Sequence, residues 1–435
     1  MAKTTRSLIL AAVLFLAACS FQNQTELPPT ETALTFASQT TDTAAPAQAS
    51  ETAAPTSTPL PPTATPQPPQ KSPTPIIVSG EPFPLVPPGS EIDIKVVELI
   101  TADFGWGIAP DQESLYHIFR TDDGGQGWSE ITPPQPIDEQ TTWEVPAVEF
   151  NDPKNGWVAY TGSNLIWSTQ DGGRTWKPAG LEFDTLLGGI IHSLDNDQVW
   201  FFQFVDGGMQ KVYTVLYKSE NGGDTWSKLL DPFTDADIQA FDKTGVDFHN
   251  AQYGWLTRFF RGVTPNIRLD LTVDGGQTWQ SLELPPPTTG TNPFSTCACG
   301  LYDPHLESTQ AGSFLLTCEC EPFDDPLIKS YLYQTDDGGS SWTIEYIPEG
   351  DLHFISTGTY YVIGQEIYRS EDAGANWDLI KTVYWDGQLS FVDQQIALGI
   401  AHCLDDCETA LVKTTNGCQT FQLIEPKVLP STTER

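Results

Sequence analysis

One eight-residue pattern recurs along the chain, and this repetition constrains the fold more than any other feature. The pattern is Ser or Thr, any residue, Asp or Asn, any residue, a glycine in most copies, two further residues and an aromatic ring. The copies are Thr121–Trp128, Thr169–Trp176, Ser219–Trp226, Thr272–Trp279, Thr335–Trp342, Ser370–Trp377 and Thr414–Phe421. Self-similarity of this kind is the signature of a repeat architecture.

Each copy has the chemistry of a hairpin turn. The Asp or Asn side chain can accept hydrogen bonds from backbone N–H groups a few residues later. The glycines provide backbone angles that other residues find strained, and the aromatic ring covers the turn. We therefore assign these side chains a structural role and no catalytic role: Asp123, Asp171, Asn221, Asp274, Asp337, Asp372, Asn416, Trp128, Trp176, Trp226, Trp279, Trp342 and Trp377.

A second motif precedes most copies. It is an apolar residue, a polar turn and then Gly-Trp, as in 102–107, 150–159 and 249–256. Short strand-like segments flank both motifs, and the aromatic anchors of successive copies are 35 to 63 residues apart. This period is typical of propeller blades. The sequence thus predicts an all-β, seven-bladed β-propeller of four-stranded antiparallel blades over residues 92–426, followed by a C-terminal tail, 427–435.

The eight-residue pattern resembles the box of the BNR/Asp-box superfamily, which includes sialidases, sortilin-type receptors and xyloglucanases. The pairing of this box with an upstream Gly-Trp is similar to the repeat of photosystem II stability/assembly factor-like propellers. The resemblance covers about 330 residues. It implies the fold, while the shared residues are structural and imply little about function.

The N-terminal region has a different composition. Residues 1–18 combine Lys3 and Arg6 with a short apolar run, as a signal peptide does, and the run is too short to span a bilayer. Leu16-Ala17-Ala18-Cys19 resembles the lipobox of bacterial lipoproteins, which implies lipidation of Cys19; an ordinary signal peptide is the alternative. Residues 19–91 are rich in Pro, Thr and Ala and predict a disordered stalk. We expect an extracytoplasmic protein, anchored by lipid to the membrane of the bacterial cell envelope.

The chain is strongly acidic. It has 57 Asp and Glu against 21 Lys and Arg, a formal net charge of −36. Such a charge excludes nucleic acid as a partner and favours cationic partners, divalent ions or neutral ligands, although solubility alone also explains it. No cofactor is expected. Asp324-Asp325 and Asp405-Asp406 are candidate Ca²⁺ turns or simply solvated turns. The six histidines show no metal-ligand spacing, and we expect them to pack or to lie at the surface.

The cysteines suggest disulfides. Cys297, Cys299, Cys318 and Cys320 fall on two expected neighbouring strands, where an antiparallel register places Cys297 opposite Cys320 and Cys299 opposite Cys318. A four-thiolate zinc site and free thiols are the alternatives. Cys403 and Cys407 flank a short tip and form a third candidate pair. Cys418, which replaces a glycine of the last copy, has no evident partner.

One cluster of basic residues suggests a binding surface. The candidate patch is Arg258, Phe259, Phe260, Arg261 and Arg268, in a hairpin expected on the face opposite the boxes. It suits an acidic partner, and a solvated hairpin with packed phenylalanines is the alternative. The arginine triad and the Phe/Tyr-Arg-Ile-Pro signature of sialidases are missing, so a sialidase is not expected.

The favoured function is a non-catalytic, membrane-anchored binding or assembly scaffold that recognises a protein or a glycan. A surface glycoside hydrolase is the alternative.

The lipobox gives the first testable prediction. Replacing Cys19 with Ala removes the lipidated thiol, so Cys19→Ala should move from the detergent phase to the aqueous phase in detergent partitioning. Cys418→Ala is the matched control and should stay with the detergent. Retention of the Cys19→Ala variant in the membrane fraction would contradict the lipid anchor.

Overall fold

The computed structural model describes residues 82–136, 144–208, 211–231, 233, 242–288, 292–321, 327–403 and 409–430. All of these residues belong to one compact unit. The expected signal peptide, Cys19, nearly all of the expected stalk, Asp324-Asp325, Asp405-Asp406 and Cys407 lie outside the described residues. In the described part, no helix is long and apolar enough to cross a membrane.

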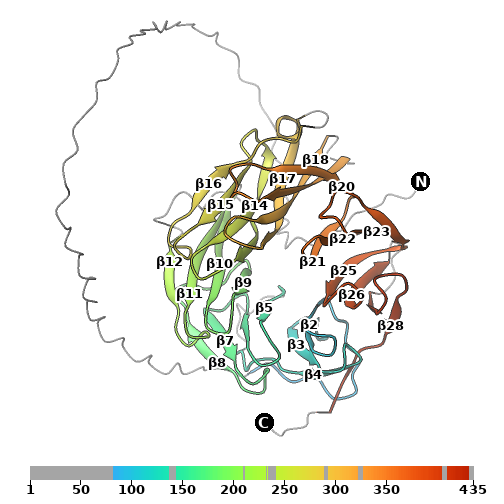
Figure 1. Ribbon diagram of the computed structural model, residues 1–435. Helices are drawn as coiled ribbons and strands as arrows, with labels where there is room; N and C mark the ends of the chain where they lie inside the picture. Colours follow the sequence, from blue (N-terminus) through green and yellow to red (C-terminus); the bar gives the residue numbers. More distant parts are fainter. Residues whose placement is uncertain are drawn as a thin grey trace, which may run out of the picture. The chain divides into compact units, whose positions relative to one another are not determined.

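Consecutive strands form antiparallel groups of four, which we number as repeats 1 to 7 (Figure 1). Repeats 1 and 2 contain β1 (Val96–Leu99), β2 (Gly105–Pro110), β3 (Tyr116–Thr121), β4 (Gly127–Glu130), β5 (Ala147–Phe150), β6 (Gly156–Ala159), β7 (Leu165–Thr169) and β8 (Lys177–Gly180). Repeats 3 and 4 contain β9 (Gly189–Ser193), β10 (Val199–Gly208), β11 (Lys211–Ser219), β12 (Ser227–Leu230), β13 (Asp242–Phe248), β14 (Gly254–Val263), β15 (Arg268–Thr272) and β16 (Gln280–Glu283).

The later repeats follow the same order. A short 3-10 helix, η1 (Pro293–Ser295), precedes repeat 5. Repeats 5 and 6 contain β17 (Cys297–Leu306), β18 (Gly312–Cys320), β19 (Leu327–Thr335), β20 (Thr343–Ile347), β21 (Asp351–Ser356), β22 (Thr359–Ile363), β23 (Glu366–Ser370) and β24 (Asp378–Thr382). Repeat 7 contains β25 (Trp385–Phe391), β26 (Ala397–Cys403), β27 (Ala410–Thr414) and β28 (Gln422–Ile424).

The all-β prediction is confirmed, and sheets of this kind are the units from which β-propellers are built. Two sheets depart from four strands. Pairing of β14 with β17 joins repeats 4 and 5 into one eight-stranded sheet. A last strand, β29 (Lys427–Val428), pairs in parallel with β4 of repeat 1. This pairing lies beyond residue 426, where the sequence predicts the repeats to end.

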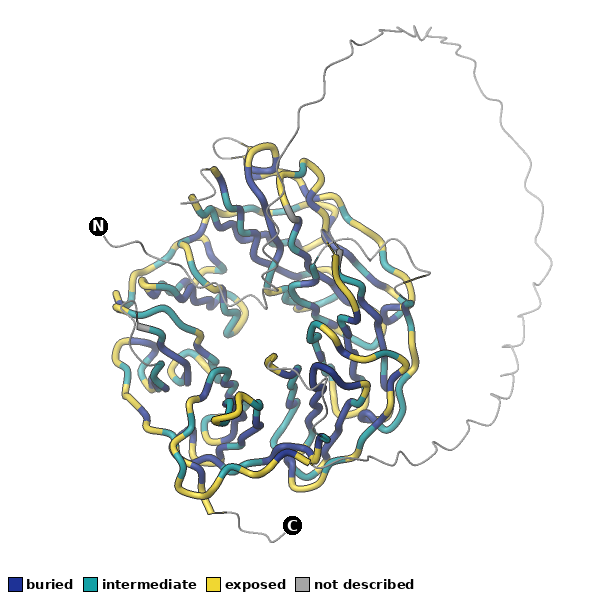
Figure 2. Tube along the Cα trace, turned by 180° about the vertical axis from the view of Figure 1, so that it is seen from behind, coloured by how far each residue is buried: buried dark blue, intermediate teal, exposed yellow. Residues whose placement is uncertain are grey.

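The hydrophobic cores lie between successive sheets. Trp157 of repeat 2, for example, belongs to the same core as Phe201 of repeat 3, and every adjacent pair of repeats shares such a core. Repeats 7 and 1 do so as well, through Leu398, Ile400, Val97 and the box residue Trp128. Buried residues accordingly follow the strands, while many of the exposed residues lie in the connections (Figure 2). No sheet can cover its own faces, so each depends on its neighbours.

The eight-residue boxes form closed turns between the third and fourth strands of each repeat. In repeat 2, the Thr169 hydroxyl donates to Asp171 Oδ1 at 2.9 Å and accepts from the N–H of Gly173 at 2.9 Å. Asp171 also accepts from the N–H and the hydroxyl of Thr175, at 2.8 and 2.7 Å. Gly172 and Gly173 have φ of 75° and 84°, in the left-handed region that favours glycine. The same pattern recurs in the other boxes, with Ala373 and Cys418 adopting this backbone in the last two.

Box turns also receive hydrogen bonds from the preceding repeat. The indole N–H of Trp157 donates to the carbonyl of Gly222 at 2.9 Å, and that of Trp200 to Gly275 at 2.8 Å. Lys413 of repeat 7 reaches the Gly124 carbonyl of repeat 1 at 2.8 Å. In repeats 2 and 3 the residue at the Trp position of the upstream motif is therefore tied to the next box along the chain.

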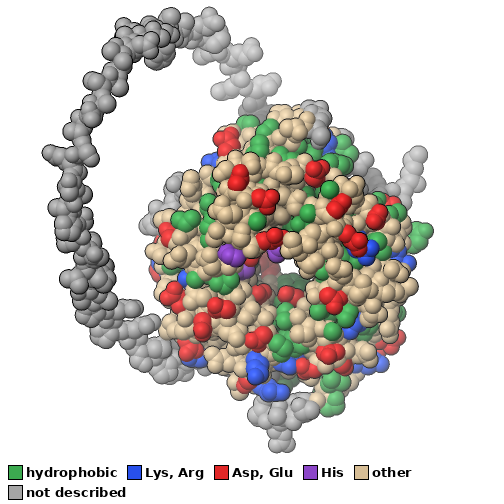
Figure 3. Space-filling model, in the orientation of Figure 1, with side chains coloured by type: hydrophobic (Ala, Val, Ile, Leu, Met, Phe, Trp, Pro, Cys, Tyr) green, Lys and Arg blue, Asp and Glu red, His purple; other side chains and the backbone are tan. Residues whose placement is uncertain are grey.

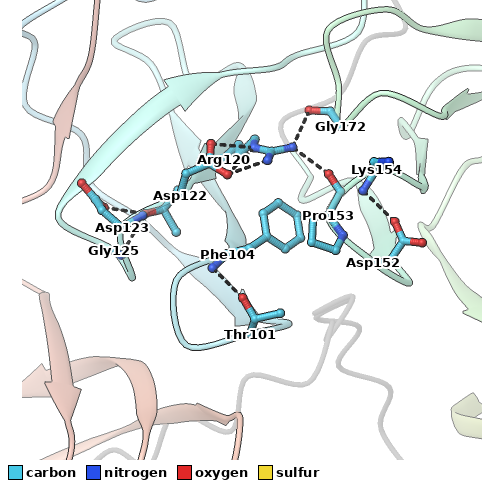
Figure 4. A network of polar contacts seen from close by, with 11 residues as sticks. Thr101, Phe104, Arg120, Asp122, Asp123, Gly125, Asp152, Pro153, Lys154 and Gly172 are labelled. Atoms are coloured by element: carbon cyan, nitrogen blue, oxygen red, sulfur yellow. Dashed lines mark hydrogen bonds and ion pairs between the residues drawn. The ribbon is translucent and has the colours of Figure 1, made fainter.

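Arg120 makes the corresponding contact from repeat 1 to repeat 2 (Figure 4). Its guanidinium pairs with Asp122, lies 4.6 Å from the centre of the Phe104 ring and donates to the Pro153 carbonyl at 2.7 Å. It also lies within 3.4 Å of the Gly172 carbonyl. A flexible cation thus takes the place that an indole N–H has in repeats 2 and 3.

The disulfide prediction for repeat 5 is confirmed. Cys297 bonds to Cys320 and Cys299 to Cys318, each pair directly opposite across β17 and β18. Cys418 is a buried free thiol. The candidate pair of Cys403 with Cys407 stays a prediction, because Cys407 lies outside the described residues.

The box geometry predicts an asymmetry between two substitutions of one residue. Asp171→Ala removes the acceptor of the turn and should lower the free energy of unfolding by about 1–3 kcal/mol. Asp171→Asn should cost less than half as much, because Asn221 makes the equivalent contacts with Thr225 in repeat 3. Urea unfolding measures both. Equal losses of unfolding free energy in the two variants would contradict the assignment of Asp171 as the hydrogen-bond acceptor of the turn.

The pH dependence of stability gives a second test of the role of Asp171. Partial burial acts to raise the pKa of Asp171, but hydrogen bonds from Thr175 and Thr169 outweigh it and hold the pKa below its ordinary value. The stabilisation is therefore present above pH 4 and is lost as pH falls through the folded-state pKa. Asp171→Asn should lack this acid-dependent loss.

Candidate functional site in the central channel

The basic patch expected from the sequence is not assembled. Arg258 is 2% exposed and pairs with the buried Asp270, and Phe260 is 1% exposed within a core. Phe259 is half-buried, and only Arg268 is exposed. The prediction failed because β14 continues to Val263, so Arg258 lies in mid-strand and not at a hairpin tip. The side chain of Arg261 lies outside the described set.

A different set of polar residues comes together around a central opening. The first strand of each repeat lies nearest this opening, and acidic and histidine side chains gather around it (Figures 1 and 3). Each of these strands places one polar residue opposite the second residue of the Gly-Trp motif or its equivalent. We call these residues the channel ring: Glu98, Glu149, His192, Asp247, His305, His353 and Ser390.

Four members of the channel ring bind the first strand of the following repeat. In each case the ring member accepts a hydrogen bond from the residue that directly follows the ring member of the next repeat. The pairs are Glu149 with the Ser193 hydroxyl (2.9 Å), His192 with the Phe248 N–H (3.2 Å), Asp247 with the Leu306 N–H (2.6 Å) and Ser390 with the Leu99 N–H (2.8 Å). The inner edge of a first strand has backbone groups without a sheet partner, and these side chains satisfy some of them.

The other three members, Glu98, His305 and His353, line a cavity of about 420 Å³. Asp303 lies in the same wall, and the rings of Trp106, Phe354 and Phe391 complete it. His305 stacks on Phe354 with ring centres 4.9 Å apart. The Nε2 atom of His353 is buried and has no hydrogen-bond partner among the described residues.

Burial shifts the acid–base properties of these groups. Burial, together with the neighbouring Glu149, raises the pKa of Glu98 to about 8. Burial likewise raises the pKa of Glu149 to about 7, against the hydrogen bond from Ser193. Asp303 is exposed to solvent in the channel, but desolvation by the surrounding protein and the neighbouring Asp351 raise its pKa to about 7. Burial lowers the pKa of His353 to about 4. At neutral pH Glu98 is thus mostly a neutral acid and His353 a neutral imidazole.

The cavity therefore offers carboxyl groups, an unused imidazole nitrogen and aromatic faces. In the part of the chain that the structure describes, no group of three or more His, Cys, Asp or Glu side chains is arranged to hold a metal ion. His305 and His353 pack against Phe354 and Phe391, as the sequence predicts, and both also line the cavity. The channel ring has a signal in the sequence, because a polar residue stands one position before the apolar end of most first strands, as in Val97-Glu98-Leu99 and Val246-Asp247-Phe248.

The chain is similar to known proteins in fold and, over a short stretch, in sequence. No family model matches it. It is 38% identical over 65 residues to the photosystem II assembly lipoprotein Ycf48 of Synechocystis sp., which is 15% of this chain and 18% of that protein. The similarity to photosystem II assembly factor-like propellers is thus confirmed, although it spans less than a fifth of that relative.

Two solved structures align with this chain at low identity, and of the two the second, with a TM-score above 0.5, bears on the fold. YCF48 from Cyanidioschyzon merolae aligns with a TM-score of 0.44 and 14% identity, over 76% of this chain and 97% of that one. The polysaccharide lyase Uly1 aligns with a TM-score of 0.51 and 9% identity, over 74% and 90%. At these identities the alignments concern fold alone.

The raised pKa of Glu98 predicts a pH effect on stability. The folded state holds a proton on Glu98 that the unfolded chain releases near pH 4.5, so stability should fall as pH rises from 5 to 9. Glu98→Gln should flatten this slope and exceed the wild type at pH 9 by on the order of 1 kcal/mol. Glu345→Gln, on the exposed side of β20, is the control. Superimposable pH profiles for wild type and Glu98→Gln would contradict the assignment.

Proposed function

We propose that the protein is a membrane-anchored, extracytoplasmic, non-catalytic scaffold. Its seven repeats are the blades of one seven-bladed propeller on a disordered stalk, with the lipidated Cys19 as anchor. It binds a protein or glycan partner through the face opposite the boxes. The partial similarity to a protein named as an assembly lipoprotein supports this role. The name of that relative does not carry a photosystem partner over to this chain.

The observation that carries the proposal is an unequal distribution of exposed apolar residues between the two faces. Antiparallel order places the boxes on one face, and places the turns between second and third strands and the connections between repeats on the other. Among the described residues, the exposed large apolar side chains of this second face are Val145, Leu186, Phe233, Val263, Leu327 and Tyr384. Tyr346, Leu379 and Leu423 are exposed on the fourth strands of their repeats, and Leu85 precedes the first repeat. On the box face, Val273 is exposed in a box, with Leu429 beside β4. More of the exposed apolar side chains of the described residues therefore lie on the second face than on the box face, and this supports its assignment as the partner-binding face.

The second face is also built up and reinforced in repeats 3 to 5. Strands β10, β14 and β17 each have 10 residues, against 4 in β6 and 5 in β22. The two disulfides join β17 and β18 at their ends on this face. Reinforcement by disulfides limits the motion of the extended hairpins, which reduces the entropy lost on binding.

Affinity capture from the native envelope tests the proposal. The intact lipoprotein should retain a specific partner, and Phe233→Ser with Leu327→Ser should weaken its capture at least tenfold, because 63% and 59% of these side chains are exposed. Val273→Ser on the box face is the matched control, since 65% of that side chain is exposed. Loss of the partner in the control but not in the double variant would refute the assignment of the face.

A surface glycoside hydrolase is the second candidate, because Glu98 and Asp303 line one cavity. Glycosidases need two carboxyl groups about 5–10 Å apart around the scissile bond. Release of reducing sugar from envelope oligosaccharides, abolished by Asp303→Asn, would replace the scaffold account.

A further inference from the structure

Three members of the channel ring line the cavity and make no hydrogen bond to the following repeat among the described residues, although His305 and His353 pack against Phe354 and Phe391 of the next first strands. Glu98, His305 and His353 occupy the same register as the four ring members that bind the following repeat. None of the three donates or accepts a comparable bond to the next first strand among the described residues. We call these three residues the open arc.

The open arc lies in a surrounding that lacks positive charge. Among the residues that line the cavity, the titratable groups are Glu98 on β1, Asp303 and His305 on β17, and His353 on β21; β25 contributes Ser390 and aromatic or apolar groups. Glu149 on β5 raises the pKa of Glu98, and Asp351 raises that of Asp303. No lysine or arginine lines this cavity. A bound cation would relieve the repulsion among these carboxylates.

The open arc also contains an unused hydrogen-bond acceptor. Within the part of the chain that the structure describes, the buried Nε2 of His353 has no hydrogen-bond partner. Burial lowers the pKa of this imidazole and keeps it neutral, so that its lone pair is available in one tautomer. An N–H donor on the ligand would satisfy it. Buried polar atoms without a partner are uncommon in folded proteins and call for such an explanation.

Aromatic rings form the rest of the wall. Phe354 and Phe391 line the cavity, each beside a histidine of the open arc. Aromatic faces attract organic cations and offer nothing to a hydrated metal ion. An anion would be repelled by the carboxyl groups of Glu98 and Asp303, and no lysine or arginine lines the cavity to offset this. Carboxylates, an N–H acceptor and aromatic faces together select one ligand chemistry.

We propose that the open arc binds an organic cation that carries N–H groups, an alkylammonium or a guanidinium. This site is separate from the partner-binding face and goes beyond the scaffold role. The cation ion-pairs with Glu98 and Asp303, donates to His353 Nε2 and lies against Phe354. A free amine and a Lys or Arg side chain of another protein share this chemistry.

Calorimetric titration of the full chain tests the site. We expect n-butylammonium and n-butylguanidinium to bind, and n-butanol not to bind. Because the cation competes with protons on Glu98 and Asp303, affinity should weaken up to about tenfold between pH 8 and 7 and more steeply between pH 7 and 6. Butyltrimethylammonium, which has no N–H group, should bind at least threefold more weakly than n-butylammonium.

Two variants locate the site. Glu98→Gln should weaken binding at least tenfold while Glu345→Gln leaves it unchanged. Phe354→Leu should weaken binding about two- to fivefold, and it provides a second test if Glu98→Gln does not fold. Phe233→Ser with Leu327→Ser should not affect binding, so failure here is distinguishable from failure of the partner-binding face.

The proposal is overturned if no cation binds, if Glu98→Gln binds as the wild type does, or if n-butanol binds equally well. It is also overturned if a neutral oligosaccharide, and none of the cations, binds in a Glu98-dependent manner. Tighter binding of spermidine than of acetyl-Gly-Lys-Gly-amide would support a free amine as the ligand, and the reverse order a partner's side chain.

Discussion

Hydrogen bonds from each box turn to its own Asp or Asn side chain hold every repeat closed, and the rest of the structure depends on them. The closed turn leaves the carbonyl of the first glycine facing outward. In repeats 2 and 3 the indole N–H of the preceding Gly-Trp motif donates to that carbonyl, as Trp157 does to Gly222. One turn therefore stabilises its own hairpin and also fixes the next sheet against the previous one. For this reason the most repeated residues of the chain are structural.

The inner edges of the sheets impose a second requirement. A first strand without a neighbour on its inner side leaves backbone groups unpaired at the channel. Glu149, His192, Asp247 and Ser390 satisfy groups of the next repeat, which explains polar residues at their positions. Glu98, His305 and His353 of the open arc occupy the same register but make no such hydrogen bond among the described residues. This difference separates the candidate ligand site from the rest of the channel ring.

The sequence predicts local features well and features of longer range poorly. The box turns and both disulfides follow from residues close in sequence or from antiparallel register, and the structure contains them. The prediction of a binding patch around Arg258 was wrong, because the length of β14 is set by its pairing with β13 and β17 and not by local composition. The channel ring was missed because each member's role depends on a residue of the following repeat.

The central claim is that the face opposite the boxes binds a partner while the boxes only hold the fold. Hydrogen–deuterium exchange of the full chain, alone and with its captured partner, tests this claim most directly. The account predicts new protection at the ends of β14, β17 and β19 and around Phe233, with unchanged exchange in the box turns. Protection confined to the box turns would contradict it.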